Sequence, residues 1–272
     1  MTATPRLAIV IVSYNTKTDL ARCLASLRDT PPAVTLQIVV VDNASRDGSA
    51  TWVREHCPDV RLIEAGDNLG FAKANNLGIR ATASELVLLL NSDTVVPPHA
   101  LDRLVAALDR HPSAAAAGPR LIDGAGNPEL SWGRMISPRA EWHQRALMRR
   151  LARGDAAALA QVERLSREER LVDWVSGACL LVRREAAEAV GLLDERYFMY
   201  TEDVDFCAAL RARGGDILFA PSSEVIHLRG RSAATAPAAT NARYRESQLA
   251  FYRKHHPRWV PALRLYLALR GR

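Results

Sequence analysis

The sequence lacks long apolar runs and contains few cysteines. No stretch of its 272 residues approaches ~18 consecutive apolar residues, so we expect no membrane-spanning helix. The first residues lead directly into a strand-like run, without the charged and then apolar segments of a signal peptide. The four cysteines stand far apart without a C-x-x-C pair, at Cys23, Cys57, Cys179 and Cys207. This pattern excludes a disulfide framework or zinc site and is typical of reduced, buried thiols in a cytoplasmic protein.

Several well-known nucleotide and hydrolase motifs are also absent. The sequence contains no G-x-x-x-x-G-K-[ST], no G-x-S-x-G, no H-E-x-x-H, and no G-x-G-x-x-G after its first predicted strand. These absences exclude a P-loop NTPase, the common dinucleotide-binding loop, a serine-hydrolase elbow and a zincin. A nucleotidyltransferase would carry a glycine-rich loop after the first strand, where Ser13-Tyr14-Asn15 stands instead.

The composition is that of an ordinary globular protein, but its charge is unevenly spread. Hydrophobic residues make up 48% and charged residues 24%, which is enough apolar material for a large core. The net charge is +6, yet residues 241–272 alone carry eight Lys/Arg against one acid, so residues 1–240 sum to −1. A basic tail indicates an anionic partner such as a membrane surface, nucleic acid or phosphate, or else a solvated helix face.

The first third of the chain alternates strand and helix patterns. Buried, β-branched runs predict strands at residues 7–13, 37–41, 60–64 and 85–90. Helical spacing predicts helices at residues 19–27, 49–56, 71–81 and 99–110. Such alternation predicts an α/β fold with a mostly parallel central sheet flanked by helices. Ligands of these sheets bind beyond the carboxyl ends of the strands.

The remaining two thirds predict a smaller second region and C-terminal helices. We expect loops or a hairpin at 119–138, surface helices within 140–170, and a strand at 174–183 followed by a helix at 184–190. A short helix at 203–213 and two short strands at 216–220 and 224–227 follow. Residues 229–240 are rich in Gly, Ala, Ser, Thr and Pro and predict a mobile loop.

Three polar clusters follow predicted strands or begin a helix. Asp42 ends the second strand, where it is able to accept hydrogen bonds from a ribose or base, or to cap the next helix. Asp93, in Asn91-Ser92-Asp93, is either a turn residue or an oxygen ligand for Mg²⁺ or Mn²⁺ completed by substrate phosphates. Glu202 and Asp203 either complement a helix dipole or supply a general base.

His227 stands near Arg229 and Arg231 after the last predicted strand. A lone histidine at a strand end is usually structural. Beside two arginines, it is also a candidate for a metal and diphosphate site.

The order and spacing of these clusters, with further motifs between them, are more specific than any one of them. The stretches are residues 11–15 (IVSYN), 41–49 (VDNASRDGS), 68–78 (NLGFAKANNLG), 90–93 (LNSD), 177–183 (GACLLVR), 191–195 (GLLDE) and 200–206 (YTEDVDF), with His227, Gly230 and Ser232. The chain thereby resembles the inverting glycosyltransferases of family 2, which have the GT-A fold, and most closely their bacterial rhamnosyltransferase-like branch. The resemblance spans residues 7 to about 232.

The resemblance implies roles for individual side chains. The donor site it implies consists of Ser13, Tyr14 and Asn15 at the base, Asp42 on the base or ribose, and Asn68, Gly70, Lys73, Asn76 and Ser92 beside the nucleotide. Asp93 matches the last acid of the family's D-x-D metal motif, whose first position is here Asn91, and His227 matches a further metal ligand. Asp203 matches the catalytic base, with Glu202 as the second choice. Trp174, Gly177 and Ala178 would form the acceptor floor, and we expect Arg229 and Arg231 to close over the diphosphate.

The implied activity is inverting transfer of a sugar, with Mg²⁺ or Mn²⁺ as cofactor. The resemblance favours dTDP-L-rhamnose as donor, with UDP-sugars as the alternative, and a cell-surface glycan or polyprenyl-diphosphate-linked glycan as acceptor. Residues 1–120 would bind the nucleotide sugar, residues 121–240 the acceptor, and the basic helical tail 241–272 a membrane surface. We therefore expect a cytoplasmic protein, peripheral at the inner face of the cell membrane.

Two other classes of function remain as alternatives. One is a nucleotide-sugar-binding protein without catalysis, for which Asn91 in place of an acid is the hint. The other is a nucleic-acid-binding protein that uses the basic tail. The tail has no recognition motif or aromatic stacking platform, so we expect no nucleic-acid partner.

Overall fold

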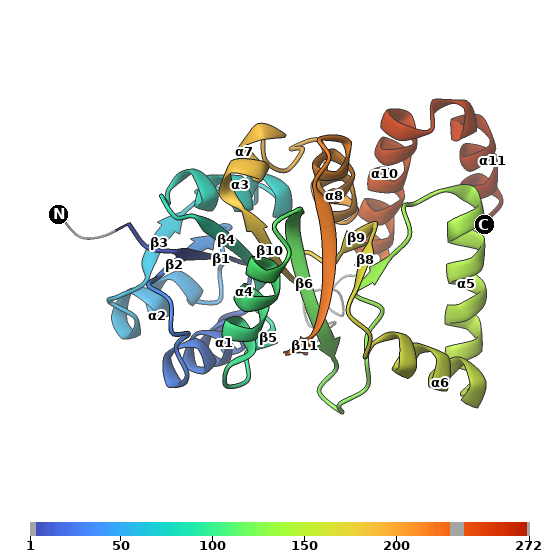
Figure 1. The fold of residues 1–272 in the computed structure, drawn as a ribbon. Helices are drawn as coiled ribbons and strands as arrows, with labels where there is room; N and C mark the ends of the chain where they lie inside the picture. Colours follow the sequence, from blue (N-terminus) through green and yellow to red (C-terminus); the bar gives the residue numbers. More distant parts are fainter. Residues whose placement is uncertain (1–3, 229–236, 271–272) are drawn as a thin grey trace.

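The computed structural model describes residues 4–228 and 237–270, which form a layered α/β architecture (Figure 1). In this part of the chain a nine-stranded sheet has the order β3-β2-β1-β4-β10-β6-β11-β5, and β8 pairs with β11. A second, two-stranded sheet joins β7 to β9. None of the helices within the described ranges combines the length and apolar character needed to cross a membrane.

The amino-terminal elements match the sequence-based prediction closely. They are β1 (Leu7–Ser13), α1 (Lys17–Asp29), β2 (Leu36–Asp42), α2 (Ser49–His56), β3 (Arg61–Glu64), α3 (Phe71–Arg80), β4 (Leu86–Asn91), β5 (Thr94–Val95) and α4 (Ala100–Arg110). Strand β1 pairs in parallel with both β2 and β4, and in this register Ser13 lies opposite Asp42 and Val12 opposite Asn91. The polar residues that end three neighbouring strands therefore meet at one edge of the sheet.

The carboxyl-terminal elements complete the sheet and add a helical wall. They are β6 (Ala114–Ile122), β7 (Trp132–Gly133), α5 (Pro138–Ala152), α6 (Ala156–Leu165), β8 (Arg170–Val172), β9 (Trp174–Val175), β10 (Cys179–Arg183), α7 (Arg184–Ala189), α8 (Glu202–Ala212), β11 (Asp216–His227), α10 (Pro237–His255), the 3-10 turn η1 (Pro257–Trp259) and α11 (Val260–Arg270). Strand β10 runs antiparallel to β4 and β6, whereas β6 and β11 are parallel. The sheet is thus mixed but mostly parallel.

Four predictions for this part are corrected. Residues 119–122 belong to β6 rather than to a loop, and the predicted strand 174–183 is interrupted between β9 and β10. The two strands predicted at 216–227 form one strand, β11, with an irregularity between Ala220 and Glu224. The predicted loop 229–240 falls largely outside the described residues, but its last residues, from Pro237, are helical.

Two hydrophobic clusters cover the two faces of the sheet. Alternation along β1 sends Leu7, Ile9 and Ile11 to the cluster that packs on α1, α2 and α4, and Val10 to the cluster that includes residues of α3, α8 and α10. Strands buried on both faces explain the continuous apolar runs of the sequence. Figure 1 shows α5 and α11 beside this layered body, next to α10.

Candidate active site

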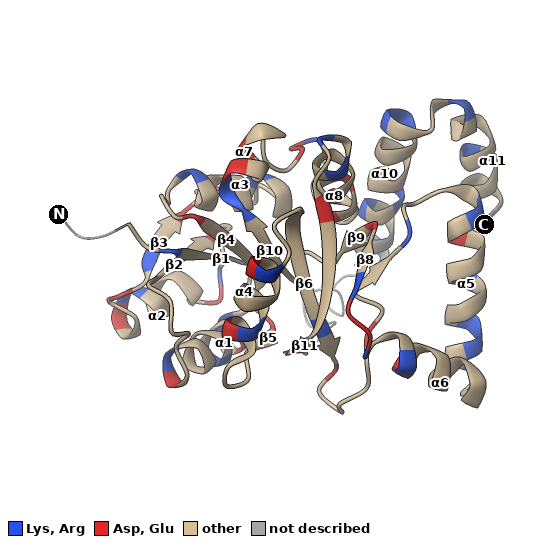
Figure 2. Ribbon diagram, viewed as in Figure 1, with Lys and Arg blue, Asp and Glu red and all other residues tan. Residues whose placement is uncertain are grey.

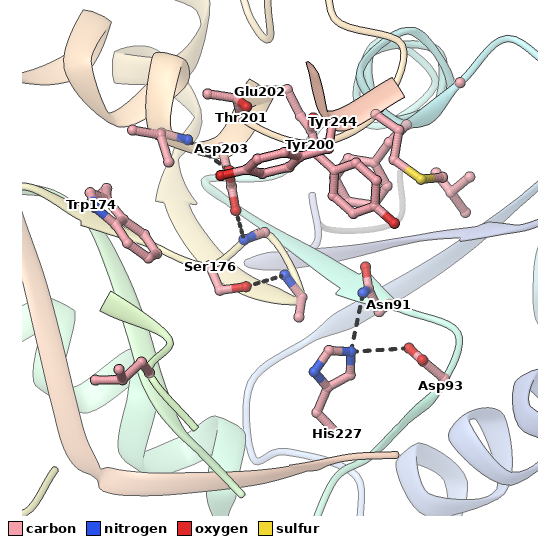
Figure 3. Close-up of a pocket in the computed structure, with 18 of the residues that line it drawn as sticks. Asn91, Asp93, Trp174, Ser176, Tyr200, Thr201, Glu202, Asp203, His227 and Tyr244 are labelled. Carbon is pink, nitrogen blue, oxygen red and sulfur yellow. Dashed lines mark hydrogen bonds and ion pairs between the residues drawn. The ribbon is translucent and has the colours of Figure 1, made fainter. Parts of the chain in front are cut away.

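A cavity of about 820 Å³ opens at the carboxyl ends of β1 and β4. It is bounded by the loop before α3, by the start of α8, by the break between β9 and β10, and by α5. The sequence-predicted residues that line it are Tyr14, Asn68, Gly70, Ser92, Asp93, Trp174, Gly177, Ala178, Glu202, Asp203 and His227. Residues predicted for donor, metal, base and acceptor therefore share one space (Figure 3).

Ser13 supports the cavity from behind. Its side chain is fully buried, and its Oγ lies 3.0 Å from Thr16 Oγ1, which lies 2.9 Å from Ser92 Oγ. This chain of hydroxyls fixes Ser92, which lines the cavity. Ser13 has no exposed surface in this structure, and its predicted place at the base pocket stays a prediction.

Asp42 presents an unused acceptor at the same edge. Its carboxylate is 3% exposed, and its Oδ2 accepts a hydrogen bond from the Ser45 backbone N–H at 3.0 Å. Its Oδ1 is buried without a hydrogen-bond partner among the described residues. An unpartnered buried carboxylate oxygen is costly, and a donor hydroxyl or N–H from a ligand would relieve that cost.

Asn43, which lies in the motif after β2 but had no role of its own in the prediction, organises the loop before α3. Its Nδ2 donates to Asn68 Oδ1 at 2.9 Å and its Oδ1 accepts from the Leu69 backbone N–H at 2.8 Å. Asn68 Oδ1 in turn accepts from the Gly70 N–H at 3.1 Å. The signal for Asn43 was its position directly after a strand-ending acid, in a turn-rich segment.

Gly70 joins this loop to the turn before α8. Its φ of +78° lies in the region that favours glycine, and an added Cβ would stand 2.3 Å from the Phe198 carbonyl oxygen. The next N–H, of Phe71, donates to that same oxygen at 2.6 Å. The close approach holds the predicted donor loop against the segment that carries Asp203.

His227 bridges two carboxylates at the opposite side of the cavity. Its Nε2 lies 3.3 Å from Asp93 Oδ1, and its Nδ1 lies 3.1 Å from Glu129 Oε2. Burial alone would lower the pKa of His227, but the hydrogen bonds and charges of Asp93 and Glu129 raise it to about 9. Glu129, 8% exposed in the segment between β6 and β7, carried no sequence signal because it stands in a Gly/Pro-rich stretch.

The side chains around Asp93 fit a divalent cation in part. Asp93 and His227 both line the cavity, and the Asn91 amide nitrogen lies 3.5 Å from His227 Nε2. A hard cation such as Mg²⁺ commonly uses one or two carboxylates and completes its shell with substrate phosphates. Within residues 4–228 and 237–270, however, no three His, Cys, Asp or Glu side chains form a ready metal cluster. For His227 to bind a cation together with Asp93, its Nε2 would first have to lose its proton.

Asp203 is the most sharply positioned acid of the cavity. Its Oδ2 accepts from the Gly177 N–H and its Oδ1 from the Val204 N–H, both at 2.8 Å. Burial raises the pKa of Asp203, and these backbone hydrogen bonds oppose the shift. Gly177 permits the approach, because an added Cβ would stand 3.3 Å from Asp203 Cβ. The held carboxylate is suited to accept a proton.

Glu202 lines the same cavity but, unlike Asp203, leaves one of its carboxyl oxygens without a hydrogen bond from the described residues. It is 5% exposed, and its Oε2 has no hydrogen-bond partner in the described part of the chain. Burial, followed by the negative charge of Asp203, raises the pKa of Glu202 well above its ordinary value. The two residues before it, Tyr200 and Thr201, have φ values of +70° and +72°, which is uncommon for residues other than glycine. Backbone strain therefore accompanies the start of α8.

The acceptor side combines the predicted floor with residues that the sequence did not reveal. Trp174 donates from Nε1 to the Arg134 carbonyl oxygen at 2.9 Å. Figure 3 shows Trp174 and Ser176 below Asp203, and the rings of Tyr200 and Tyr244 beside it. Helix α5 contributes Glu141, Gln144, Arg145 and Met148 to the lining.

Besides Ser13, four predicted donor residues do not line the cavity. Asp42 ends its strand behind Asn43, which does line it, and Lys73 is exposed on α3. Asn15 holds its own loop by accepting from the Arg46 N–H at 2.7 Å. Asn76 is fully buried, and its Nδ2 donates to the Leu193 carbonyl oxygen at 2.8 Å. Its predicted place beside the nucleotide stays a prediction. The predicted Arg229 and Arg231 lie outside the described residues.

Comparison with known proteins agrees with this geometry. The model of glycosyl transferase family 2 matches residues 8–191. The chain is 35% identical to the N-acetylglucosaminyl-diphospho-decaprenol L-rhamnosyltransferase of Mycobacterium tuberculosis, over 97% of this chain and 91% of that protein. It is 28% identical to the low-salt glycan biosynthesis hexosyltransferase Agl10 of Haloferax volcanii, over 81% of this chain and 66% of that protein.

A solved structure extends the likeness to the fold. The mannosyltransferase PcManGT from Pyrobaculum calidifontis, in complex with GDP-Man and Mn²⁺, has a TM-score of 0.63 and 20% identity, over 97% of this chain and 69% of that one. At this identity the likeness concerns the fold alone. The GT-A architecture predicted from the sequence is confirmed.

Proposed function

The chain belongs to glycosyl transferase family 2, and we propose that it transfers L-rhamnose from dTDP-L-rhamnose to N-acetylglucosamine carried on a polyprenyl diphosphate. The enzyme class, a glycosyltransferase, follows from the family. The sugar and the acceptor are supported by the activity named for the mycobacterial relative, which is 35% identical. The carrying observation is that Asp203, Asp93 and His227 line one cavity at the sheet edge where Asp42 ends its strand.

In the proposed reaction, Asp203 acts as the general base. Its carboxylate takes the proton of an acceptor hydroxyl while that oxygen attacks the anomeric carbon from the face opposite the diphosphate. The bond from the anomeric carbon to the diphosphate oxygen breaks, and its electron pair leaves with the nucleotide diphosphate. A single displacement inverts the anomeric centre. The two backbone N–H groups on Asp203 keep its carboxylate aimed into the cavity.

We assign the metal and nucleotide contacts to the sheet edge. Asp93 and His227 would hold Mg²⁺ or Mn²⁺, and a cation bound there neutralises charge on the leaving diphosphate. Tyr14, Asn68 and Gly70 line the cavity on this side, and Asp42, behind the cavity-lining Asn43, would accept from the base or ribose through its unpartnered Oδ1. Residues 1–120 would thus bind the donor, and residues 121–240 the acceptor.

We also propose that the C-terminal tail rests on an anionic membrane, as a lipid-linked acceptor requires. In α11, Leu263 packs inward at 7% exposed, whereas Leu265 and Leu269, one turn apart, are 64% and 71% exposed. Trp259 in η1 is also 53% exposed. Exposed leucines and an interfacial Trp on a basic segment are typical of a helix that lies in the membrane interface. This would make the enzyme peripheral at the inner face of the cell membrane.

A panel of nucleotide sugars tests the donor. With Mn²⁺ present and ligand at a hundred times its Kd, mass action should raise the Tm by about 5–10 °C for dTDP-L-rhamnose. Asp42→Asn, which removes the charge but keeps the shape of the side chain, should lose most of this shift. A larger shift with a UDP-sugar than with dTDP-L-rhamnose would refute the proposed donor.

A further inference from the structure

Helix α5 brings one permanently charged cation into the cavity. Of the described residues that line it, Arg145 is the only Lys or Arg. The acids that line it are Asp93, Glu141, Glu202 and Asp203. Among the described lining residues, Arg145, on the wall formed by α5, is therefore the one Lys or Arg candidate for an anionic ligand.

Arg145 is held in place by the C-terminal helices. Its Nη1 donates to the Tyr266 hydroxyl at 2.5 Å, its Cζ lies 4.9 Å from the centre of the Tyr266 ring, and its Nη2 lies 3.6 Å from Glu141 Oε2. Glu141 in turn accepts from Gln248 Nε2 and, at 3.1 Å, from the Tyr252 hydroxyl. The guanidinium has five N–H donors, and its side chain remains 36% exposed. It is thus positioned in advance and still accessible to a ligand.

The surroundings of Arg145 suit a lipid diphosphate. Met148, which lies on the same side of α5 and is 47% exposed, lines the cavity together with Leu130 and Ile136. Burial, and then the charges of Glu141 and Asp203, raise the pKa of Tyr244, whereas Arg145 opposes them. Tyr244 lines the same cavity as Arg145 and Asp203. Figure 2 shows further basic residues along α5, α10 and α11.

We propose that Arg145 binds the diphosphate of the lipid-linked acceptor and thereby makes the enzyme specific for acceptors that carry a diphosphate. The inference rests on the proposed function, since it requires a polyprenyl-diphosphate acceptor. The planar guanidinium forms paired, charge-assisted hydrogen bonds with phosphate oxygens. The sugar attached to that diphosphate then lies between Arg145 and Asp203, and the prenyl chain extends along Met148.

Two acceptors that differ only in the diphosphate test this role. One is N-acetylglucosamine on a short prenyl diphosphate; the other is an N-acetylglucosaminide of the same prenyl chain without phosphate. For Arg145→Gln we expect the KM of the diphosphate acceptor to rise about 10- to 100-fold. The KM of the neutral acceptor and of the donor should stay unchanged. Arg145→Lys should fall in between, because a point charge replaces a planar fork.

The control is Arg149→Gln, an equal charge change on an exposed α5 position that does not line the cavity. It should leave both acceptors unaffected. An equal loss on both acceptors would show that Arg145 acts through its contact with Tyr266, and a raised donor KM would assign it to the donor; either result overturns the inference. Wild-type enzyme that uses neither acceptor would overturn the proposed function itself. If the wild type transfers the sugar and Arg145→Gln does so with the same KM values, the inference is overturned but the proposed function is not.

Discussion

Separate replacement of Asp203 and Glu202 by their amides distinguishes the base from its neighbour. Both carboxyls line the cavity, and burial raises the pKa of each. Asp203 is stabilised as an anion by two backbone N–H groups at 2.8 Å, whereas Glu202 has an unpartnered oxygen and an anionic neighbour. We therefore expect Asp203 to work ionised and Glu202 to remain protonated when Asp203 is charged.

The expected rates differ by orders of magnitude. Loss of a general base slows turnover by about 10²- to 10⁴-fold, or about 3–5 kcal/mol in the barrier, and Asp203→Asn should show that loss. Glu202→Gln copies the neutral carboxyl in shape and polarity, so its turnover should stay close to that of the wild type. Donor binding should survive in both variants, because neither residue belongs to the proposed nucleotide contacts.

The raised pKa values also fix the pH dependence. Because Asp203 must be deprotonated to act, the wild-type rate should fall as pH drops through the pKa of Asp203, which burial raises above its ordinary value. The folded protein holds the Glu202 proton more tightly than the unfolded chain does, so stability is lost as pH rises from the ordinary carboxyl pKa toward the raised one. Glu202→Gln removes this loss.

Glu202→Gln should therefore stabilise the protein, although most substitutions of buried residues destabilise it. At neutral pH, Glu202→Gln should raise the free energy of unfolding by about 0.5–2 kcal/mol, which corresponds to about 1–8 °C in Tm. The gain should shrink in acid. The assays are initial rates of sugar transfer, thermal unfolding over pH, and donor calorimetry as a folding control. A Glu202→Gln rate as low as that of Asp203→Asn would refute the assignment of the base.

Three further changes test other parts of the structure. Asp93→Ala should abolish Mn²⁺-dependent donor binding, and an unchanged calorimetric titration would contradict a metal role. The double variant Leu265→Gln/Leu269→Gln should pellet with anionic vesicles at least about tenfold less than the wild type, because exposed leucines would no longer enter the interface. The wild type on neutral vesicles is the control. Equal pelleting of the variant and the wild type would refute membrane contact. Gly70→Ala should cost about 2–6 kcal/mol in urea unfolding through its φ of +78° and the 2.3 Å approach to the Phe198 carbonyl, and a cost near zero would contradict this geometry.

The amino-terminal half was predictable because local pattern and tertiary role coincide there. Parallel strands buried on both faces produce continuous apolar runs, and β1 and α2 begin and end at the predicted residues. Parallel pairing then brings Ser13 and Asp42 level with each other. What the sequence did not show is which side chain faces the cavity and which is buried behind it.

The carboxyl-terminal half was less predictable because packing overrides local preference there. Strand β6 begins with four alanines, which are poor strand formers. They are buried in the centre of the sheet, and an added Cβ at Gly118 would stand 2.6 Å from Val175, so only small side chains fit. A role for Glu129 likewise could not be predicted from local sequence, because its partner His227 stands 98 positions away and only folding brings the two together.

Helix α5 shows most clearly why the acceptor side cannot be predicted from local sequence. Its cavity face is fixed by contacts of Glu141 with α10 and of Arg145 with α11, between residues 107 to 121 positions apart. The helix is inserted between β7 and β9, which pair with each other and carry Trp174 at the acceptor floor. Changes in this insert therefore alter the proposed acceptor wall without altering the strands β1, β2 and β4 at the proposed donor edge. For the proposed function, acceptor contacts therefore depend on α5 and its long-range partners, whereas donor contacts depend on the amino-terminal strands.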